Sequence, residues 1–221
     1  MKTSGQETRL TGRFRVSWEL LEPRETDHII SVGCKEAVFE SWLAGRVASV
    51  TAIDINRAVI DSNRRTIPGI TFEYGDILAG TGYPDERFDK IVFLEVLEHL
   101  PRETEQRALA ELYRILKKGG TLVLSTPNDT RLTRLLDPAW WLIEHRHYRR
   151  AALVRMLRDS RFTVEAVRTG GGFVELVWIP VFYLLLRMRL DRFVTPFMER
   201  LIDREYRREG FYTLIMKCRK C

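Results

Sequence analysis

The chain has 221 residues, of which 45% are hydrophobic and 30% charged, so it can bury one substantial core and nothing in its composition requires two domains. Its three cysteines are too few and too poorly spaced for a disulfide framework or a zinc site, and residues 1–15 contain no apolar signal segment, so we expect a cytoplasmic protein. The net charge of +6 is uneven, with arginines gathered between Arg131 and Arg161, but a solvated helix face is the commoner outcome of such a run, so we expect no nucleic-acid partner.

The first predicted element is a short helix near the N-terminus. Phe14, Trp18 and Leu21 fall on one helical face before Pro23 ends the segment. We expect this N-terminal segment to form a lid over the main fold.

A strand–helix–strand unit runs from His28 to Asp54. It has an apolar run, a turn at Gly33, an amphipathic segment and a second apolar run that ends at Asp54. In α/β nucleotide-binding folds an acid at this place accepts hydrogen bonds from a ribose. The alternative role for Asp54 is to cap the next helix, although Asn56 could be that cap instead. The unit predicts a nucleoside site.

Two further strands lead to the same edge of the predicted sheet. Asp76 follows the strand Ile70–Tyr74 and could accept from the exocyclic amine of a base, or it could simply shape a turn. The buried strand Phe88–Leu94 delivers further side chains to the carboxyl edge, where open α/β sheets bind ligands. These side chains are Glu95, Glu98 and His99.

The rest of the chain continues the alternation of predicted strands and helices. An amphipathic helix is expected from Arg102 to Leu116, ended by Gly119 and Gly120, and a fifth strand from Thr121 to Ser125. Later elements are a helix at 149–159, a sixth strand at 162–167 and a final strand at 211–217.

This ordered set resembles the class I S-adenosylmethionine-dependent methyltransferases, with the closest similarity to their small-molecule and quinone-modifying branches. The similarity is carried by Gly33, Asp54 and Asp76 after the first three strands, EVLEHL at 95–100 and LKKGGTLVLSTPN at 116–128. It implies an α/β, Rossmann-like, doubly wound sheet of seven mostly parallel strands with an antiparallel last strand. It also implies one domain of four parts: a lid segment at 1–23, a cofactor-binding core at 24–168, a helical insertion at 169–209 and a final strand at 210–221.

The resemblance implies S-adenosylmethionine as cofactor. The implied cofactor-binding residues are Gly33, Cys34, Lys35, Asp54, Ile55, Asp76, Ile77 and Glu95. The glycine turn departs from the family pattern, which usually has an acid two residues before the first glycine and glycines at alternate positions after it. This chain has Ser31, Lys35 and Ala37 there, and the ammonium of Lys35 could meet the cofactor carboxylate or point to solvent.

Methyl transfer is an in-line displacement, so the protein mainly aligns the reactants and excludes water. A base is needed if the acceptor is a hydroxyl or an amine, and the candidates are His99, His145 and His147. Our preferred interpretation has no metal. The alternative is a Mg²⁺ site formed by Glu95, Glu98, His99 and His145, because ExxEH resembles the metal-binding pattern of some RNA and quinone methyltransferases.

Two other function classes remain open. A nicotinamide-dependent oxidoreductase would use the same Asp54, but it should show a fuller GxGxxG motif. A cofactor-free interaction protein on a degenerate methyltransferase fold would explain Lys35 and Ala37.

The predicted insertion contains an apolar stretch, Leu176–Leu186, followed by arginines and by a second helix that we expect to begin at Thr195 and Pro196. The stretch is shorter than the roughly 20 residues needed to span a bilayer. A helix that is apolar all round must be covered by its own domain, by a second subunit as in a homodimer, or by lipid. The neighbouring arginines favour peripheral contact with an anionic membrane and a hydrophobic, lipid-like acceptor.

Overall fold

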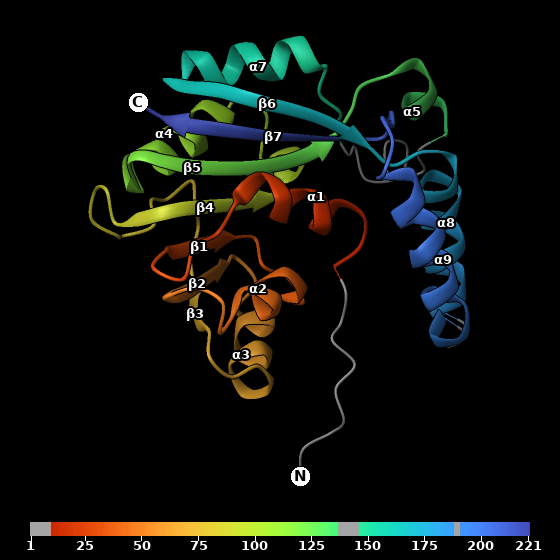
Figure 1. Cartoon of the computed structure of the whole chain (residues 1–221), viewed down its shortest axis with the longest axis horizontal. Coiled ribbons are helices and arrows are strands. Elements are labelled where there is room, and N and C mark those ends of the chain that lie inside the picture. Colours follow the sequence, from red (N-terminus) through yellow and green to blue (C-terminus); the bar gives the residue numbers. More distant parts are fainter. Residues whose placement is uncertain (1–9, 137–145, 188–190) are drawn as a thin grey trace.

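The computed structural model describes residues 10–136, 146–187 and 191–221. Its strands are β1 (His28–Val32), β2 (Ser49–Asp54), β3 (Thr71–Tyr74), β4 (Phe88–Leu94), β5 (Leu116–Pro127), β6 (Phe162–Gly170) and β7 (Thr213–Lys220). They form one sheet in the order β3-β2-β1-β4-β5-β7-β6 (Figure 1). The first five strands pair in parallel, whereas β7 is antiparallel to both β5 and β6. The predicted sheet is therefore confirmed.

Helices cover both faces of this sheet. Within the described residues the helices are α1 (Gly12–Leu21), α2 (Val38–Leu43), α3 (Arg57–Thr66), the 3-10 helix η1 (Leu97–His99), α4 (Glu105–Ile115), α5 (Arg131–Leu136), α7 (Arg150–Asp159), α8 (Phe173–Arg187) and α9 (Asp191–Glu205). Helices α4 and α7 pack on one face and α1 and α2 on the other. The resulting two-layered core is that of a doubly wound fold.

The central strands are apolar at nearly every position because both of their faces are buried. In β1, Ile29 packs toward α1 and α2, while Ile30 packs toward α4 and α7. In β4, Val92 packs toward α1 and α2, and Ile91 packs toward α4 and α7. Since successive strand residues point to opposite faces, a continuous apolar run is what a strand between two helical layers requires.

The fifth strand begins earlier than the sequence analysis predicts. Helix α4 ends at Ile115, and the next residue, Leu116, already pairs with Phe88 of β4. Gly119 takes a φ of +72°, and a Cβ on Gly120 would lie 2.9 Å from a carbonyl oxygen of β4. The two glycines therefore serve an irregular stretch inside β5, and the expectation that they end the preceding helix was wrong.

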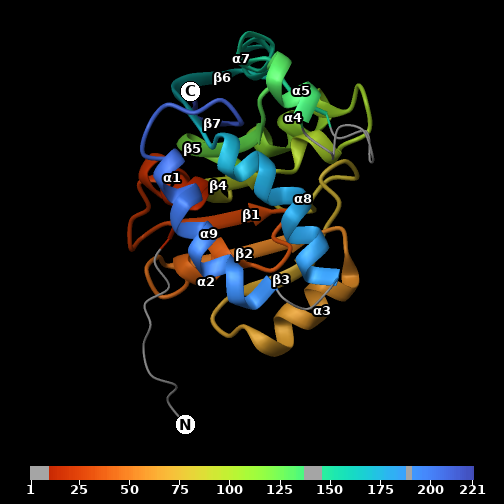
Figure 2. The same cartoon turned by 90° about the vertical axis from the view of Figure 1, so that its right-hand side faces the viewer.

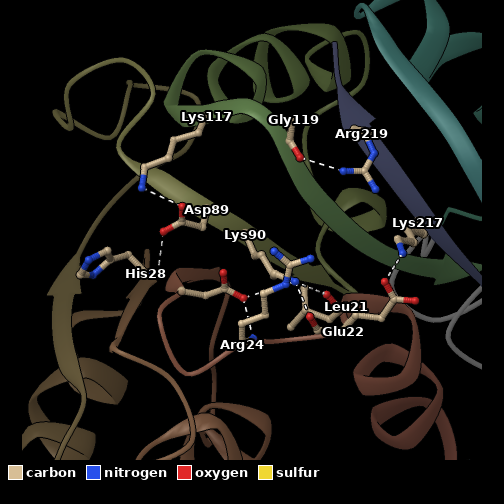
Figure 3. Close-up of polar contacts among 11 residues, drawn as sticks. Leu21, Glu22, Arg24, His28, Asp89, Lys90, Lys117, Gly119, Lys217 and Arg219 are labelled. Atoms are coloured by element: carbon tan, nitrogen blue, oxygen red, sulfur yellow. Dashed lines mark hydrogen bonds and ion pairs between the residues drawn. The ribbon is translucent and has the colours of Figure 1, made fainter.

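The C-terminal end of α1 is tied to the sheet by lysines (Figure 3). The Nζ atom of Lys90, from β4, donates to the main-chain oxygen of Leu21 at 2.7 Å and to that of Glu22. The Nζ atom of Lys217, from β7, donates to the side chain of Glu22 at 2.7 Å. The two bonds from Lys90 satisfy carbonyl groups that a helix end leaves without partners, and the ion pair with Lys217 adds a second link, so α1 is held firmly against the sheet.

Two helices separate β6 from β7, as predicted, but the second begins earlier than expected. Helix α9 starts at Asp191, so Thr195 and Pro196 lie inside it, where the proline removes a single intrahelical hydrogen bond. Helices α8 and α9 stand beside the end of the sheet toward which the arrows of β5 and β6 point, and Figure 2 looks onto them from that side. The main-chain nitrogen of Gly12 donates to Oδ1 of Asp203 at 3.0 Å, which joins α1 to α9.

Candidate functional site

A cavity of about 680 Å³ opens at the carboxyl ends of β1, β2, β3 and β4. Its volume is in the range of small-molecule sites, and open α/β sheets bind ligands at this edge. The structure brings all the sequence-predicted cofactor residues to its wall: Gly33, Cys34, Lys35, Asp54, Ile55, Asp76, Ile77 and Glu95. Further lining residues include Arg13, Phe14, Ser31, Glu40 and His99.

The turn after β1 has a glycine-like backbone although two of its residues are not glycine. Gly33 has a φ of +81°, while Lys35 and Ala37 have φ values of +43° and +53°, in the left-handed region. A Cβ on Gly33 would lie 2.4 Å from the side chain of Val96, so a larger residue does not fit there. The main chain of this turn therefore has the same left-handed conformations that the family's alternate glycines adopt easily, although Lys35 and Ala37 carry side chains.

Lys35 takes part in this turn through its main chain. Its nitrogen donates to Oδ2 of Asp54 at 3.0 Å, and its oxygen accepts from Nδ2 of Asn63 at 2.7 Å. Its side chain is 75% exposed, with Nζ 3.8 Å from Oε1 of Glu36. Of the two orientations considered for the ammonium, the structure has the one that points to solvent.

Asp54 is half-buried at the end of β2 and does not cap a helix. Oδ1 of Asn56 accepts from the main-chain nitrogens of Ala58 and Val59 at 3.0 and 3.3 Å, so Asn56 is the cap of α3. Oδ1 of Asp54 accepts from the nitrogen of Asn56 at 2.9 Å, and its other oxygen holds Lys35. Each carboxylate oxygen can accept a second bond, so the side chain can both shape the turn and receive two ligand hydroxyls.

Asp76 shapes a turn as well as lining the cavity. Its Oδ1 accepts from the main-chain nitrogen of Leu78 at 2.8 Å, which is the local role that the sequence analysis left open. Ile77 beside it is buried, whereas Ile55, across the cavity edge, is largely exposed. The remaining lone pairs of Asp76 stay available to a ligand amine.

Two carboxylates follow β4. Glu95, at a φ of +54°, accepts from Oγ of Ser125 at 2.6 Å, and Glu98 accepts from Oγ1 of Thr126 at 3.0 Å. Burial, reinforced by the negative charge of Glu95, raises the pKa of Glu98 well above its usual range. The pair therefore resists carrying two negative charges at once.

Arg13 brings a positive charge from α1 to the cavity. Burial opposes its charged form, but the carboxylates of Glu95 and Glu175 outweigh burial and raise the pKa of Arg13. Its Nη1 lies 3.7 Å from Oε1 of Glu175, which belongs to α8. Arg13 was not predicted from the sequence, because its partners are distant in the chain and no local motif marks it.

Among the described residues, His99 is the predicted catalytic histidine that lines the cavity. Burial lowers the pKa of His99 below its ordinary value of 6.5 in spite of the nearby carboxylate of Glu95, so the ring is neutral at neutral pH and can accept a proton. His147 is buried and does not line the cavity. His145 lies outside the described residues.

The alternative metal site needs Glu95, Glu98, His99 and His145, the last of which is outside the described residues. Within the described ranges, no three side chains of His, Cys, Asp or Glu come together as a group that could hold a metal ion. The carboxylates of Glu95 and Glu98 instead accept hydrogen bonds from hydroxyl groups of β5. This part of the chain therefore provides no metal-ligand set.

A buried acid faces the cavity from α2. Glu40 is 4% exposed, and its Oε1 accepts a hydrogen bond from Oγ of Ser31, at the end of β1. Burial raises the pKa of Glu40 to about 7, and the bond from Ser31 offsets this only in part. Glu40 was not predicted from the sequence. The signal that could have identified it is an acid on the apolar face of a short helix, beside Phe39 and Leu43.

Comparison with known proteins gives a family. A family model described as a methyltransferase domain matches residues 13–167. Over 151 residues the chain is 28% identical to a probable S-adenosylmethionine-dependent methyltransferase of Mycolicibacterium smegmatis, covering 67% of this chain and 58% of that protein. Over 130 residues it is 32% identical to a ubiquinone biosynthesis O-methyltransferase of Pseudomonas putida, covering 56% and 54%. The chain thus spans little more than half the length of these curated relatives.

Among solved structures, the N-methyltransferase NodS of Bradyrhizobium japonicum, in complex with S-adenosyl-L-homocysteine, has the same fold. The TM-score is 0.63, with 94% of this chain and 85% of that chain covered. At 20% sequence identity this likeness shows the fold alone. The family match ends within β6, so α8, α9 and β7 lie beyond the matched residues.

Proposed function

We propose a function from the premise that this chain belongs to the methyltransferase-domain family: it transfers a methyl group from S-adenosylmethionine to a small acceptor that is hydrophobic or lipid-linked. One observation carries the proposal. The turn at Gly33 and the acids Asp54 and Asp76 follow three neighbouring strands and line one cavity. An oxidoreductase that binds a nicotinamide cofactor has no comparable support from the family match.

The residues of the cavity fit the chemistry of S-adenosylmethionine. Asp54 accepts hydrogen bonds from the ribose hydroxyls, and Asp76 accepts from the exocyclic amine of adenine. Ile55 and Ile77 provide apolar contacts, and Gly33 lets the main chain approach the ligand. The remaining cofactor residues in this proposal are Cys34, Lys35 and Glu95, which line the same cavity.

Restoring a glycine at Lys35 should have little effect. Lys35→Gly removes a side chain from a left-handed position but adds backbone freedom to the unfolded chain, so we expect the free energy of unfolding to change by about 1 kcal/mol or less. Because the ammonium points to solvent, affinity for S-adenosylhomocysteine should stay the same or increase. Calorimetric titration measures this, and a large loss of affinity would mean that the Lys35 side chain contacts the ligand.

The chain's own part in the reaction is to align the two reactants, to exclude water and to accept a proton. S-adenosylmethionine supplies an electrophilic methyl group when bound. The protein holds it beside the acceptor in a cavity partly closed by α1, where Phe14 and Arg13 reach the wall. His99 accepts the proton that a hydroxyl or amine acceptor loses, since its ring is neutral at neutral pH.

The acceptor class is supported by the cavity wall and by relatives. Near His99 the wall is apolar through Leu94, Val96 and Leu100. Several relatives are named as ubiquinone biosynthesis O-methyltransferases, at about one-third identity over about half of this chain. The test is to incubate the protein with S-adenosylmethionine labelled in its methyl group and a hydroxylated aromatic acceptor with or without a prenyl tail. Preferential labelling of the tailed acceptor supports the proposal, and labelling of the tail-free one alone contradicts it.

Helix α8 presents an apolar strip to the surface. Phe173, Val177 and Val181 are exposed and four residues apart, so they share one helical face, while Leu176 and Trp178 are buried against the domain. The domain therefore covers one side of α8 and leaves another side uncovered. No helix in the described ranges is long and apolar enough to cross a membrane. The strip fits peripheral contact with a lipid surface, which would bring the cavity close to a lipid-linked acceptor.

Changing the strip should abolish membrane contact. We expect the intact protein to co-sediment with anionic liposomes and a variant with Phe173, Val177 and Val181 changed to serine to stay in solution. Tyr74→Ser removes an exposed aromatic residue from the edge strand β3 and should pellet like the intact protein. If intact protein and strip variant both stay in solution, the membrane proposal fails. A change from dimer to monomer in the strip variant would then assign the strip to a homodimer contact.

A further inference from the structure

We propose that Glu40 binds the ammonium group of S-adenosylmethionine, with Ser31 as the positioning residue that holds its carboxylate toward the cavity. This inference rests on the proposed function. Glu40 comes from α2 and Ser31 from the end of β1, so the carboxylate lies beside the turn at Gly33. The hydroxyl of Ser31 carries no charge and cannot replace an acid that faces an ammonium. It instead directs the carboxylate of Glu40, from the next helix, toward the cavity.

Within the described part of the chain, Glu40 lacks the ion pair that four other buried acids of this protein have. The carboxylates of Asp27, Glu105, Glu175 and Asp203 each lie within 3.7 Å of a lysine or arginine nitrogen. For Glu40 no ion pair is found among the residues that the structure describes, and its hydrogen bond comes from a neutral hydroxyl. A buried carboxylate without a positive partner is costly. A cationic ligand group in the cavity would remove that cost.

The groups around Glu40 do not provide this positive charge. Arg13, the cation that α1 brings to the cavity, pairs with Glu175 and is stabilised by Glu95 and Glu175. Asp54, from the end of β2, adds negative charge and helps burial to raise the pKa of Glu40 to about 7. The thiol of Cys34, in the turn, has a pKa raised to about 12 by burial and by Glu40, so it stays neutral. Before a ligand binds, Glu40 is therefore partly protonated near pH 7. Binding of an ammonium favours the ionised form, so a proton should be released on binding.

The experiment compares two ligands that share the adenosine part. S-adenosylhomocysteine carries the ammonium, whereas 5′-methylthioadenosine lacks the whole amino-acid part. Glu40→Gln keeps the shape of the side chain and its bond to Ser31 but removes the charge. We expect this variant to bind S-adenosylhomocysteine about 10- to 100-fold more weakly, as for the loss of a charged hydrogen bond, and to bind 5′-methylthioadenosine as the native protein does. Asp61→Asn, which changes an exposed acid of α3 that does not line the cavity, is the control and should change neither affinity.

A second readout separates an ionic role from a structural one. Titration at pH 7 in buffers of different ionisation enthalpy should show proton release when the native protein binds S-adenosylhomocysteine, and much less release for Glu40→Gln. If Glu40→Gln is unstable, Ser31→Ala should weaken binding of S-adenosylhomocysteine in the same direction. Native affinity and native proton release in Glu40→Gln would overturn the inference, as would an equal loss for both ligands. If the native protein binds neither ligand, the proposed function itself fails.

Discussion

Replacing Asp54 by alanine should weaken the binding of S-adenosylhomocysteine about 5- to 150-fold, which corresponds to the loss of a charged hydrogen-bond acceptor worth about 1 to 3 kcal/mol. The reason is the position of this carboxylate at the cavity edge, where Asn56 has taken over the capping of α3. Isothermal titration calorimetry of the purified variant measures the effect. Unchanged affinity would contradict the ribose role.

A weaker affinity alone would not prove contact with the ribose, because Asp54 also accepts from the nitrogens of Lys35 and Asn56. A ligand pair isolates the contact. Native protein should bind adenosine more tightly than 2′,3′-dideoxyadenosine, and Asp54→Ala should lose that preference. Asp61→Ala, which removes an exposed acid from α3, should leave both affinities unchanged. Asp54→Ala with the native preference intact would assign the carboxylate to the turn alone.

His99→Gln should reduce kcat about 10²- to 10⁴-fold for a hydroxyl or amine acceptor, the range for loss of a general base. Affinity for S-adenosylhomocysteine should be nearly unchanged, since other residues bind the cofactor in this account. His99 acts as a base only when neutral, and its pKa is lowered from 6.5. The native rate should therefore be constant near neutral pH and fall only at a pH below 6.5, and the variant should lose this fall.

The rate and pH profile of a second histidine variant can contradict the assignment of His99 as the base. His147→Gln is the matched comparison, because that histidine is buried and does not line the cavity. If His99→Gln keeps the native rate and pH profile while His147→Gln loses activity without unfolding, the base is assigned to the wrong histidine. Thermal unfolding of both variants excludes a general loss of structure.

The succession of strands and helices along the chain could be predicted because it rests on local patterns. The apolar run after His28, the turn at Gly33 and the acid at Asp54 already define a strand–helix–strand unit, and parallel strands place such turns at one edge. The bulge of β5 could not be predicted in this way. Gly119 and Gly120 suit the end of a helix as well as an irregular strand, and the pairing of Leu116 with Phe88 decides between them.

The parts of the site that sequence analysis missed depend on tertiary contacts. Arg13 reaches the cavity because α1 is fixed to β4 and to α9, contacts that join distant parts of the chain. Glu40 was missed because a single acid on the buried face of a short helix only interrupts the apolar pattern. Its function is indicated by the hydrogen bond from Ser31, which the sequence does not show. The departure of Lys35 and Ala37 from glycine proved compatible with the turn, since both residues adopt the left-handed backbone.

The most direct test of the central claim is a calorimetric titration of the native protein with S-adenosylhomocysteine, S-adenosylmethionine and NAD. We expect saturable one-to-one binding of the first two ligands and no binding of NAD, because the cavity joins a ribose acid, an acid for the adenine amine and a buried carboxylate for an ammonium. Binding of NAD in their place, or no binding of any of the three by folded protein, would contradict it.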